Sequence, residues 1–161
     1  MSPPPSLASP ALATVLLAAA TGARTFFGVA ETARRIAAAS DGELREPARS
    51  LARPHVVAGV SALVAFELVF DKLPFVGNRT DAGPLAGRLA SGAVIGASIA
   101  AVAGKDRAVY ALLGAAAALV GAHAGFRVRR ELSALLPPTI AAVVEDAAVA
   151  ALAQAGVRSI A

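Results

Sequence analysis

Five apolar runs, each close to 20 residues long, constrain this 161-residue chain more than any other feature of its sequence. A helix needs about 20 apolar residues to cross the roughly 30 Å hydrocarbon core of a bilayer. We therefore predict an all-α integral membrane bundle that forms one domain over residues 1–161. The predicted membrane-spanning helices lie at about residues 8–30, 54–73, 84–104, 107–127 and 138–160.

A soluble alanine-rich helical bundle is the competing class. Residues 89–104 and 108–122 contain no charged side chain, so helices there would lack the polar face that a soluble amphipathic helix presents to water. The chain is 57% hydrophobic and 16% charged, whereas a soluble domain carries about a quarter charged residues. The composition favours the membrane class and a location in the cell membrane.

Prolines, polar residues and glycines separate the apolar runs. Pro54, Pro84 and Pro138 fall where helices are expected to begin, because proline is tolerated in the first turn. Residues 31–53 form a polar linker that could hold a short surface helix, and residues 104–106 form a tight turn. No Lys or Arg precedes Arg24, so the first run is expected to belong to the mature protein rather than to a cleaved signal.

Several kinds of chemistry lack the residues they need. The absence of cysteine excludes disulfides and thiolate ligands, and two histidines, His55 and His123, are too few for a dedicated metal site. The sequence contains no phosphate-binding glycine loop, HExxH motif or nucleophile elbow, so no cofactor or metal is expected and a membrane-embedded enzyme is a minor alternative. The 15 basic residues lie mainly between apolar runs, which is typical of membrane protein loops rather than of a nucleic-acid interface.

Charged residues inside the runs are the candidate functional residues, because a charge at membrane depth is costly and usually faces the bundle interior. Lys72, Arg88 and Arg127 lie near predicted helix ends, where a long side chain reaches the interface. Glu145 and Asp146 are adjacent and diverge by about 100° on a helix, so one of them is expected to face the interior. The candidate residues are Arg24, Glu67, Asp71, His123, Glu145 and Asp146.

These residues allow two interpretations. In the first, Glu67 and Asp71, one helical turn apart, join Glu145 in a site that binds a proton or a cation, since carboxylates suit hard cations and can exchange protons when crowded in a low dielectric. In the second, Arg24 pairs with Glu67 or Glu145 and merely fixes helix positions. His123 is either a helix–helix hydrogen-bond partner or a proton relay. The first interpretation predicts transport or permeation, and the second a membrane scaffold or partner subunit.

Glycine spacing and a short internal similarity bear on packing. Gly92 with Gly96, and Gly121 with Gly125, are small-xxx-small pairs that favour close helix contact within a protomer or across a homodimer. The segments GARTFF at 22–27 and GAHAGF at 121–126 are similar, and each precedes a run that carries a glutamate. With five spans, the first and fourth would cross in opposite directions, as in an inverted repeat.

Basic residues give a small bias in orientation. With five spans, the linker, the 104–107 turn and the C-terminus share one side, with eight basic residues against six on the other. Positively charged loops favour the cytoplasm. The expected topology therefore has the linker inside and the N-terminus outside.

The segments GARTFFG, FELVFDKLP, RTDAGPLAGRLASGA, GAHAGFRVRREL and VVEDAAVAAL together resemble a bacterial family of small multi-pass membrane proteins, domain of unknown function 4126. The resemblance runs from about residue 11 to 160, and E-x-x-x-D-K-x-P with the late Glu-Asp pair is its most specific part. It implies an integral protein of the bacterial inner membrane with unassigned activity, and it supplies no mechanism.

Overall fold

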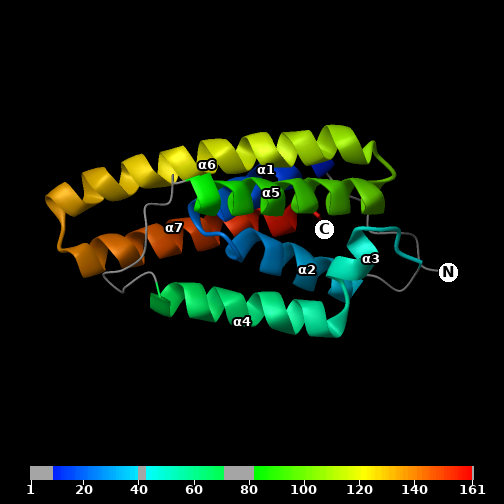
Figure 1. The fold of residues 1–161 in the computed structure, drawn as a ribbon, viewed down its shortest axis with the longest axis horizontal. Helices are drawn as coiled ribbons and strands as arrows, with labels where there is room; N and C mark the ends of the chain where they lie inside the picture. Colours follow the sequence, from blue (N-terminus) through cyan, green and yellow to red (C-terminus); the bar gives the residue numbers. More distant parts are fainter. Residues whose placement is uncertain (1–8, 40–42, 71–81, 161) are drawn as a thin grey trace.

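The computed structural model describes residues 9–39, 43–70 and 82–160, and the regular structure in these ranges is helical (Figure 1). Asp71 lies outside the described residues, as do the final residues of the predicted 54–73 span. The helices are α1 (Pro10–Ala23), α2 (Phe27–Ala39), α3 (Ala48–Leu51), α4 (Pro54–Phe70), α5 (Ala82–Ala103), α6 (Arg107–Leu135) and α7 (Pro138–Arg158).

Side chains and glycine mark where helices begin and end. The Ser9 hydroxyl accepts the Leu12 N–H at 3.3 Å and caps α1, and the Asp106 carboxylate accepts the Val109 N–H at 2.9 Å and caps α6. Gly104 adopts φ +64°, which a side chain would disfavour, and so allows the tight turn between α5 and α6. At the short helix α3, hydrogen bonding from Ser50 holds the pKa of the exposed Glu46 carboxyl below its usual range.

The predicted single span at 8–30 is wrong, because the chain reverses direction inside it. Arg24 adopts extended backbone angles and ends α1, and α2 begins three residues later. Gly28 lies so close to α1 that a Cβ placed on it would be 2.0 Å from the Leu17 carbonyl oxygen. In a continuous helix, residues 17 and 28 would be about 16 Å apart. α1 and α2 therefore form a helical hairpin, and α2 takes up residues 31–39 of the expected linker.

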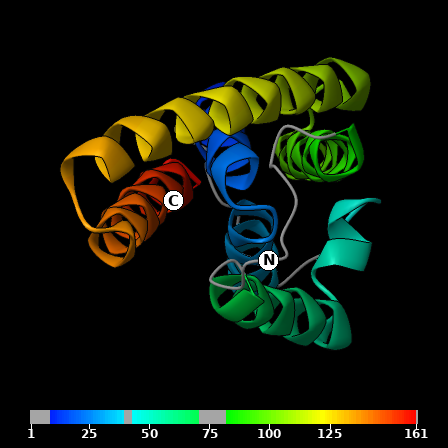
Figure 2. The ribbon, with the colours of Figure 1, turned by 60° about the vertical axis from the view of Figure 1, so that its left-hand side comes forward.

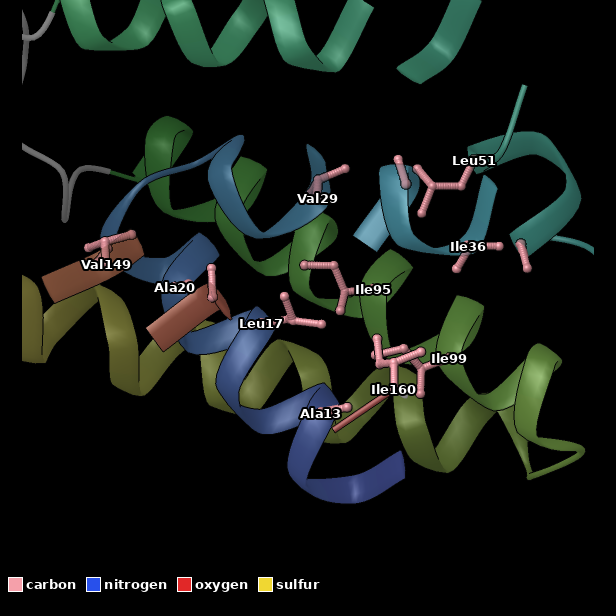
Figure 3. Close-up of a cluster of buried hydrophobic side chains, with 14 residues drawn as sticks. Ala13, Leu17, Ala20, Val29, Ile36, Leu51, Ile95, Ile99, Val149 and Ile160 are labelled. Atoms are coloured by element: carbon pink, nitrogen blue, oxygen red, sulfur yellow. The ribbon is translucent and has the colours of Figure 1, made fainter. Parts of the chain in front are cut away.

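Helix α1 is the centre of the bundle. It packs against α2, α5, α6 and α7, and its residues are buried on most sides. The hydrophobic core gathers around Leu17 of α1 and Ile95 and Ile99 of α5 (Figure 3). Many of the remaining core residues are alanines, so the helices approach one another closely.

Three of the described helices are long and apolar enough to cross a membrane: α5, α6 and α7. They begin within two residues of the predicted starts, but α6 has 29 residues and continues eight residues beyond the predicted end. Their outward faces are apolar, with Leu112 73% exposed and Val120 67% exposed. An exposed surface of this kind is expected where lipid is the solvent. By length, composition and surface, the described part of the chain is a helical bundle with three helices able to cross a membrane.

The two ends of the bundle are defined by contacts between segments distant in sequence. At one end, Arg107 at the start of α6 donates to the Glu46 carbonyl oxygen at 2.9 Å, which joins the 104–106 turn to the segment before α3. Gly156 near the end of α7 packs against Leu17. The starts of α1 and α6 and the end of α7 therefore share this end, and the hairpin turn points the other way.

This arrangement changes the relation between the first and fourth predicted spans. Gly22 and Gly121 lie where α1 and α6 pack together, and Gly125 follows beside Ala23, so the two helices run in the same direction. The expectation that they cross in opposite directions is wrong, because the hairpin returns the chain to its starting side. Helices α4 and α7 run in opposite directions (Figure 1).

Helix α4 lies at the periphery. Among the described residues, its packing contacts are with α2 and α3 and not with α5, α6 or α7. Figure 2 shows α4 apart from the layer that α5 and α6 form. This placement matters because α4 carries Glu67.

Candidate functional site

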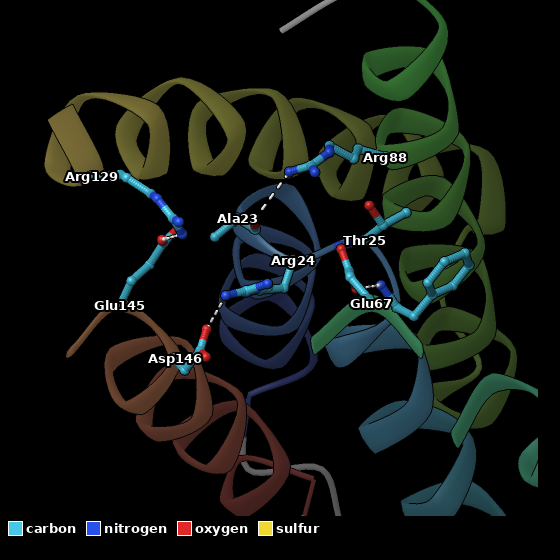
Figure 4. A network of polar contacts seen from close by, with 9 residues as sticks. Ala23, Arg24, Thr25, Glu67, Arg88, Arg129, Glu145 and Asp146 are labelled. Carbon is cyan, nitrogen blue, oxygen red and sulfur yellow. Dashed lines mark hydrogen bonds and ion pairs between the residues drawn. The ribbon is translucent and has the colours of Figure 1, made fainter. Parts of the chain in front are cut away.

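The hairpin turn brings backbone groups of two helix ends to one place inside the bundle. We call Arg24, Thr25 and Phe26 the hairpin tip. Glu67 on α4 is 9% exposed, and its carboxylate accepts hydrogen bonds from the Thr25 N–H at 2.7 Å and the Phe26 N–H at 3.1 Å (Figure 4). Free N–H groups make a helix start electropositive, and a carboxylate is stabilised there. Glu67 therefore caps the start of α2 from a different helix.

The end of α1 is capped by the opposite charge. The Arg88 guanidinium on α5, 4% exposed, donates to the carbonyl oxygens of Gly22 and Ala23, the latter at 3.1 Å. Free carbonyl groups make a helix end electronegative and favour a cation. Arg88 was expected to reach the membrane interface by virtue of its place near a helix start. That prediction is wrong, because the broken helix supplies acceptors within the bundle.

Two ion pairs connect the hairpin tip and α6 to α7. Arg24 projects from the tip and pairs with Asp146, and the two side chains are 3% and 26% exposed. Arg129 of α6 pairs with Glu145 at 2.8 Å. One of the two interpretations of the sequence paired Arg24 with Glu67 or Glu145, whereas the structure pairs it with Asp146. Adjacent Glu145 and Asp146 both have partners because the two arginines come from different elements, Arg129 from α6 and Arg24 from the tip (Figure 4).

Together these residues form a cluster of balanced charge within an apolar bundle. Each acceptor carboxylate faces N–H groups, and each guanidinium faces a carboxylate or carbonyl oxygens. Hydrogen bonds and ion pairs that involve a charged group are about twice as strong as neutral hydrogen bonds. We call this group the charged cluster, and it comprises Arg24, Glu67, Arg88, Arg129, Glu145 and Asp146.

The remaining predicted residues lie elsewhere. His123 is exposed on α6, and its Nδ1 atom is 3.0 Å from the Leu119 carbonyl oxygen of the same helix, not of a neighbour. Gly92 packs against Gly114 of α6, and Gly96 packs against Tyr110. Gly121 and Gly125 pack against α1, which places these four glycines at contacts within the protomer.

Sequence reasoning missed Arg88, Arg129 and the backbone N–H groups of the tip as members of the cluster. Arg129 was counted only as a loop charge, because it follows the apolar part of α6. The sequence offered one signal for the turn, because Arg24 interrupts an apolar run. Neither Pro nor Gly lies next to Arg24, so no helix-breaking residue marked the position. A charged residue in an apolar run indicates that its side chain needs a partner, but it does not indicate that the helix ends at that residue.

Among the described residues, no group of three or more His, Asp or Glu side chains is placed to hold a metal ion. The comparisons with known proteins found no family model, no curated protein and no solved structure that matches this chain.

Proposed function

We propose that this protein moves an ion or a small solute across the membrane, with the charged cluster at the hairpin tip as the site of passage. The observation that carries the proposal is the hairpin itself, whose two helix ends meet inside an apolar bundle. Interrupted helices are the way many transporters present backbone N–H and C=O groups to ions and solutes at membrane depth. We place the protein in the bacterial inner membrane, as its family resemblance implies.

The carboxylates supply the chemistry. Glu67 accepts two N–H groups at the tip, and Asp146 neutralises Arg24. A proton or a cation that neutralises Glu67 weakens its hold on the start of α2, because a charge-assisted hydrogen bond is about twice as strong as a neutral one. Proton or cation binding would in this way be coupled to the arrangement of the tip.

Flux through reconstituted liposomes tests the proposal. The purified chain is placed in vesicles with an internal pH dye, and gradients of sodium, potassium, chloride and small organic solutes are imposed in turn. We expect one gradient to drive proton or solute movement in the parent protein and Glu67→Gln to reduce that rate at least tenfold. Glu131→Gln is the matched control, because Glu131 is 70% exposed and pairs only with its neighbour Arg130. A parent protein that moves nothing across this panel contradicts the proposal.

A scaffold role is the second candidate, and it has its own observation. Every member of the charged cluster has a partner within the protein, so the helix ends that could receive a solute are already occupied. Buried charges of this kind can serve to fix helix positions. The protein would then support a partner subunit or a second copy of itself.

Stability measurements separate the two roles. Under the scaffold role, Glu67→Gln lowers the unfolding temperature or disperses the oligomer, and no gradient drives flux in the parent protein. Under the transport role, Glu67→Gln loses flux while the folded protein and its oligomeric state persist.

A further inference from the structure

Helix α4 is joined to the bundle differently from the other long helices. Among residues 54–67, Glu67 is the one buried residue, and the described packing of α4 involves only α2 and α3. A Cβ placed on Gly59 of α4 would meet nothing within 4 Å. By contrast, a Cβ placed on Gly92 of α5 would lie 2.5 Å from the Gly114 carbonyl oxygen of α6. Helices α5 and α6 are therefore in close backbone contact at Gly92, which we call the interlocked pair, whereas α4 makes no such contact at Gly59.

The end of α4 that carries Glu67 is held by charge-assisted hydrogen bonds. Its carboxylate accepts two N–H groups of the hairpin tip, while the neighbouring Phe66 is 52% exposed. Among the described α4 residues, Val56, Val57 and Val60 pack at the edge of the core, nearer the other end of the helix. Removing the Glu67 contact would therefore weaken the attachment of one end of α4 and leave the contacts of the other end in place.

We propose that α4 is a movable helix whose closed position is set by the Glu67 carboxylate on the hairpin tip, and that protonation of Glu67 releases it. The carboxylate balances the electropositive start of α2 and accepts one tip N–H on each oxygen. Protonation removes the charge and turns one of these oxygens into an O–H donor. The movement is a property of the chain itself, and it holds whether or not a solute is carried.

The charged groups near this contact belong to several elements. Arg24 projects from the tip beside Glu67 and pairs with Asp146, and Arg88 lies on the other side of the tip (Figure 4). On α2, Glu31 lies about one turn from the tip and pairs with Arg34 at 2.5 Å. His55 on α4 and Arg49 on α3 lie toward the far end of α4. Among the described α4 residues, Glu67 accepts the hydrogen bonds that the tip N–H groups donate.

Spin-label distances in the full-length protein test the proposal, and the chain suits the method because it has no native cysteine. Labels at Leu63→Cys on α4 and Val94→Cys on α5 report the position of α4, since both side chains are 40% exposed. Labels at Val94→Cys and Leu112→Cys report the interlocked α5–α6 pair. In nanodiscs at neutral pH, Glu67→Gln is expected to shift or broaden the α4–α5 distance distribution and to leave the α5–α6 distribution unchanged.

Acidification provides a second test of the proposal. The α4–α5 distribution of the parent protein should move toward that of Glu67→Gln as the pH falls, and the Glu67→Gln protein should no longer respond to pH. Glu131→Gln should respond as the parent does. Thr25→Pro removes one donor N–H while Glu67 remains, and the extended backbone of Arg24 suits a following proline. Identical α4–α5 distributions in all of these proteins at every pH, or a pH response that survives in Glu67→Gln, overturn the proposal.

Discussion

At the scale of single residues, the described glycines differ in the space around them. Gly28 lies against backbone, where an added Cβ would be 2.0 Å from the Leu17 carbonyl oxygen and 2.3 Å from the Thr21 hydroxyl. Gly87 of α5 has nothing within 4 Å of its Cβ position. We expect Gly28→Ala to lower the free energy of unfolding by roughly 1–3 kcal/mol, because neither the carbonyl nor the buried hydroxyl can move aside freely. Unfolding in mixed detergent micelles measures the change.

Gly87→Ala is the matched control for this prediction. It adds the same methyl group on a helix without a steric contact, so the free energy of unfolding should stay unchanged or rise by up to about 1 kcal/mol. Equal losses in the two variants would argue against the close contact between α1 and α2.

The inward orientation of Arg88 could not be predicted from the sequence. Its place near the start of an apolar run is equally compatible with a side chain that reaches the interface and with one that turns inward. The choice depends on acceptors that a different segment provides, here the carbonyl oxygens at the end of α1. Glu67 could be singled out from sequence because it lies farther from any predicted helix start, and its need for a partner was correctly anticipated. The identity of that partner, two backbone N–H groups, required the fold.

At the scale of helices, the hairpin of α1 and α2 is what sequence patterns could not resolve. α1 has 14 residues and α2 has 13, so each is about 20 Å long and too short to cross the hydrocarbon core. The predicted span at 8–30 joined α1, the tip and the first turn of α2, because the charged residues of α2 begin only at Glu31. The long helices α5, α6 and α7 were placed well, because an unbroken apolar run with Pro, Gly or Asp at its boundaries specifies a helix locally.

The pairing of Arg24 with Asp146 ties the hairpin to α7. We expect Arg24→Gln and Asp146→Asn each to lower the free energy of unfolding by about 2–3 kcal/mol. This is less than the roughly 3–5 kcal/mol for a fully buried pair, because Asp146 is 26% exposed. The double variant should lose at least about 0.5 kcal/mol less than the two single losses combined, since it removes both charges of the pair. Chemical unfolding of the four proteins gives this coupling energy.

Arg130 and Glu131 provide a control for that cycle. They form an ion pair on α6 in which the side chains are 71% and 70% exposed. Arg130→Gln should change the free energy of unfolding by no more than about 1 kcal/mol. A coupling energy near zero between Arg24 and Asp146 would show that their contact does not hold the hairpin against α7.

At the scale of the whole molecule, composition and run length predicted a helical membrane bundle, and the structure is helical with three helices able to span a membrane. What they could not predict is the number of crossings, because this depends on whether each run continues or turns back. One turn at the tip changes the side on which the chain begins. It thereby also removes the basis for an inverted repeat between the first and fourth runs.

The hairpin has a direct consequence for topology. The start of α1, the segment before α3, the 104–106 turn and the end of α7 share one end of the bundle. Eight basic residues belong to this end. At the other end, Arg88 and Arg129 are engaged in the charged cluster, which leaves Arg127 and Arg130 among the described basic residues. From this asymmetry we predict that the start of α1 and the end of α7 lie on the cytoplasmic side.

Single cysteines introduced into the cysteine-free chain test this topology. Ala11→Cys, Arg45→Cys and Ser159→Cys should be protected from a membrane-impermeant maleimide added outside intact spheroplasts and should react once the membrane is opened. Ser133→Cys, near the turn between α6 and α7, should react from outside. Five complete crossings would instead place position 11 on the same side as position 133. Reaction of Ala11→Cys from outside, with Arg45→Cys still protected, would therefore show that α1 and α2 cross the membrane as one span, because a hairpin holds both positions on one side.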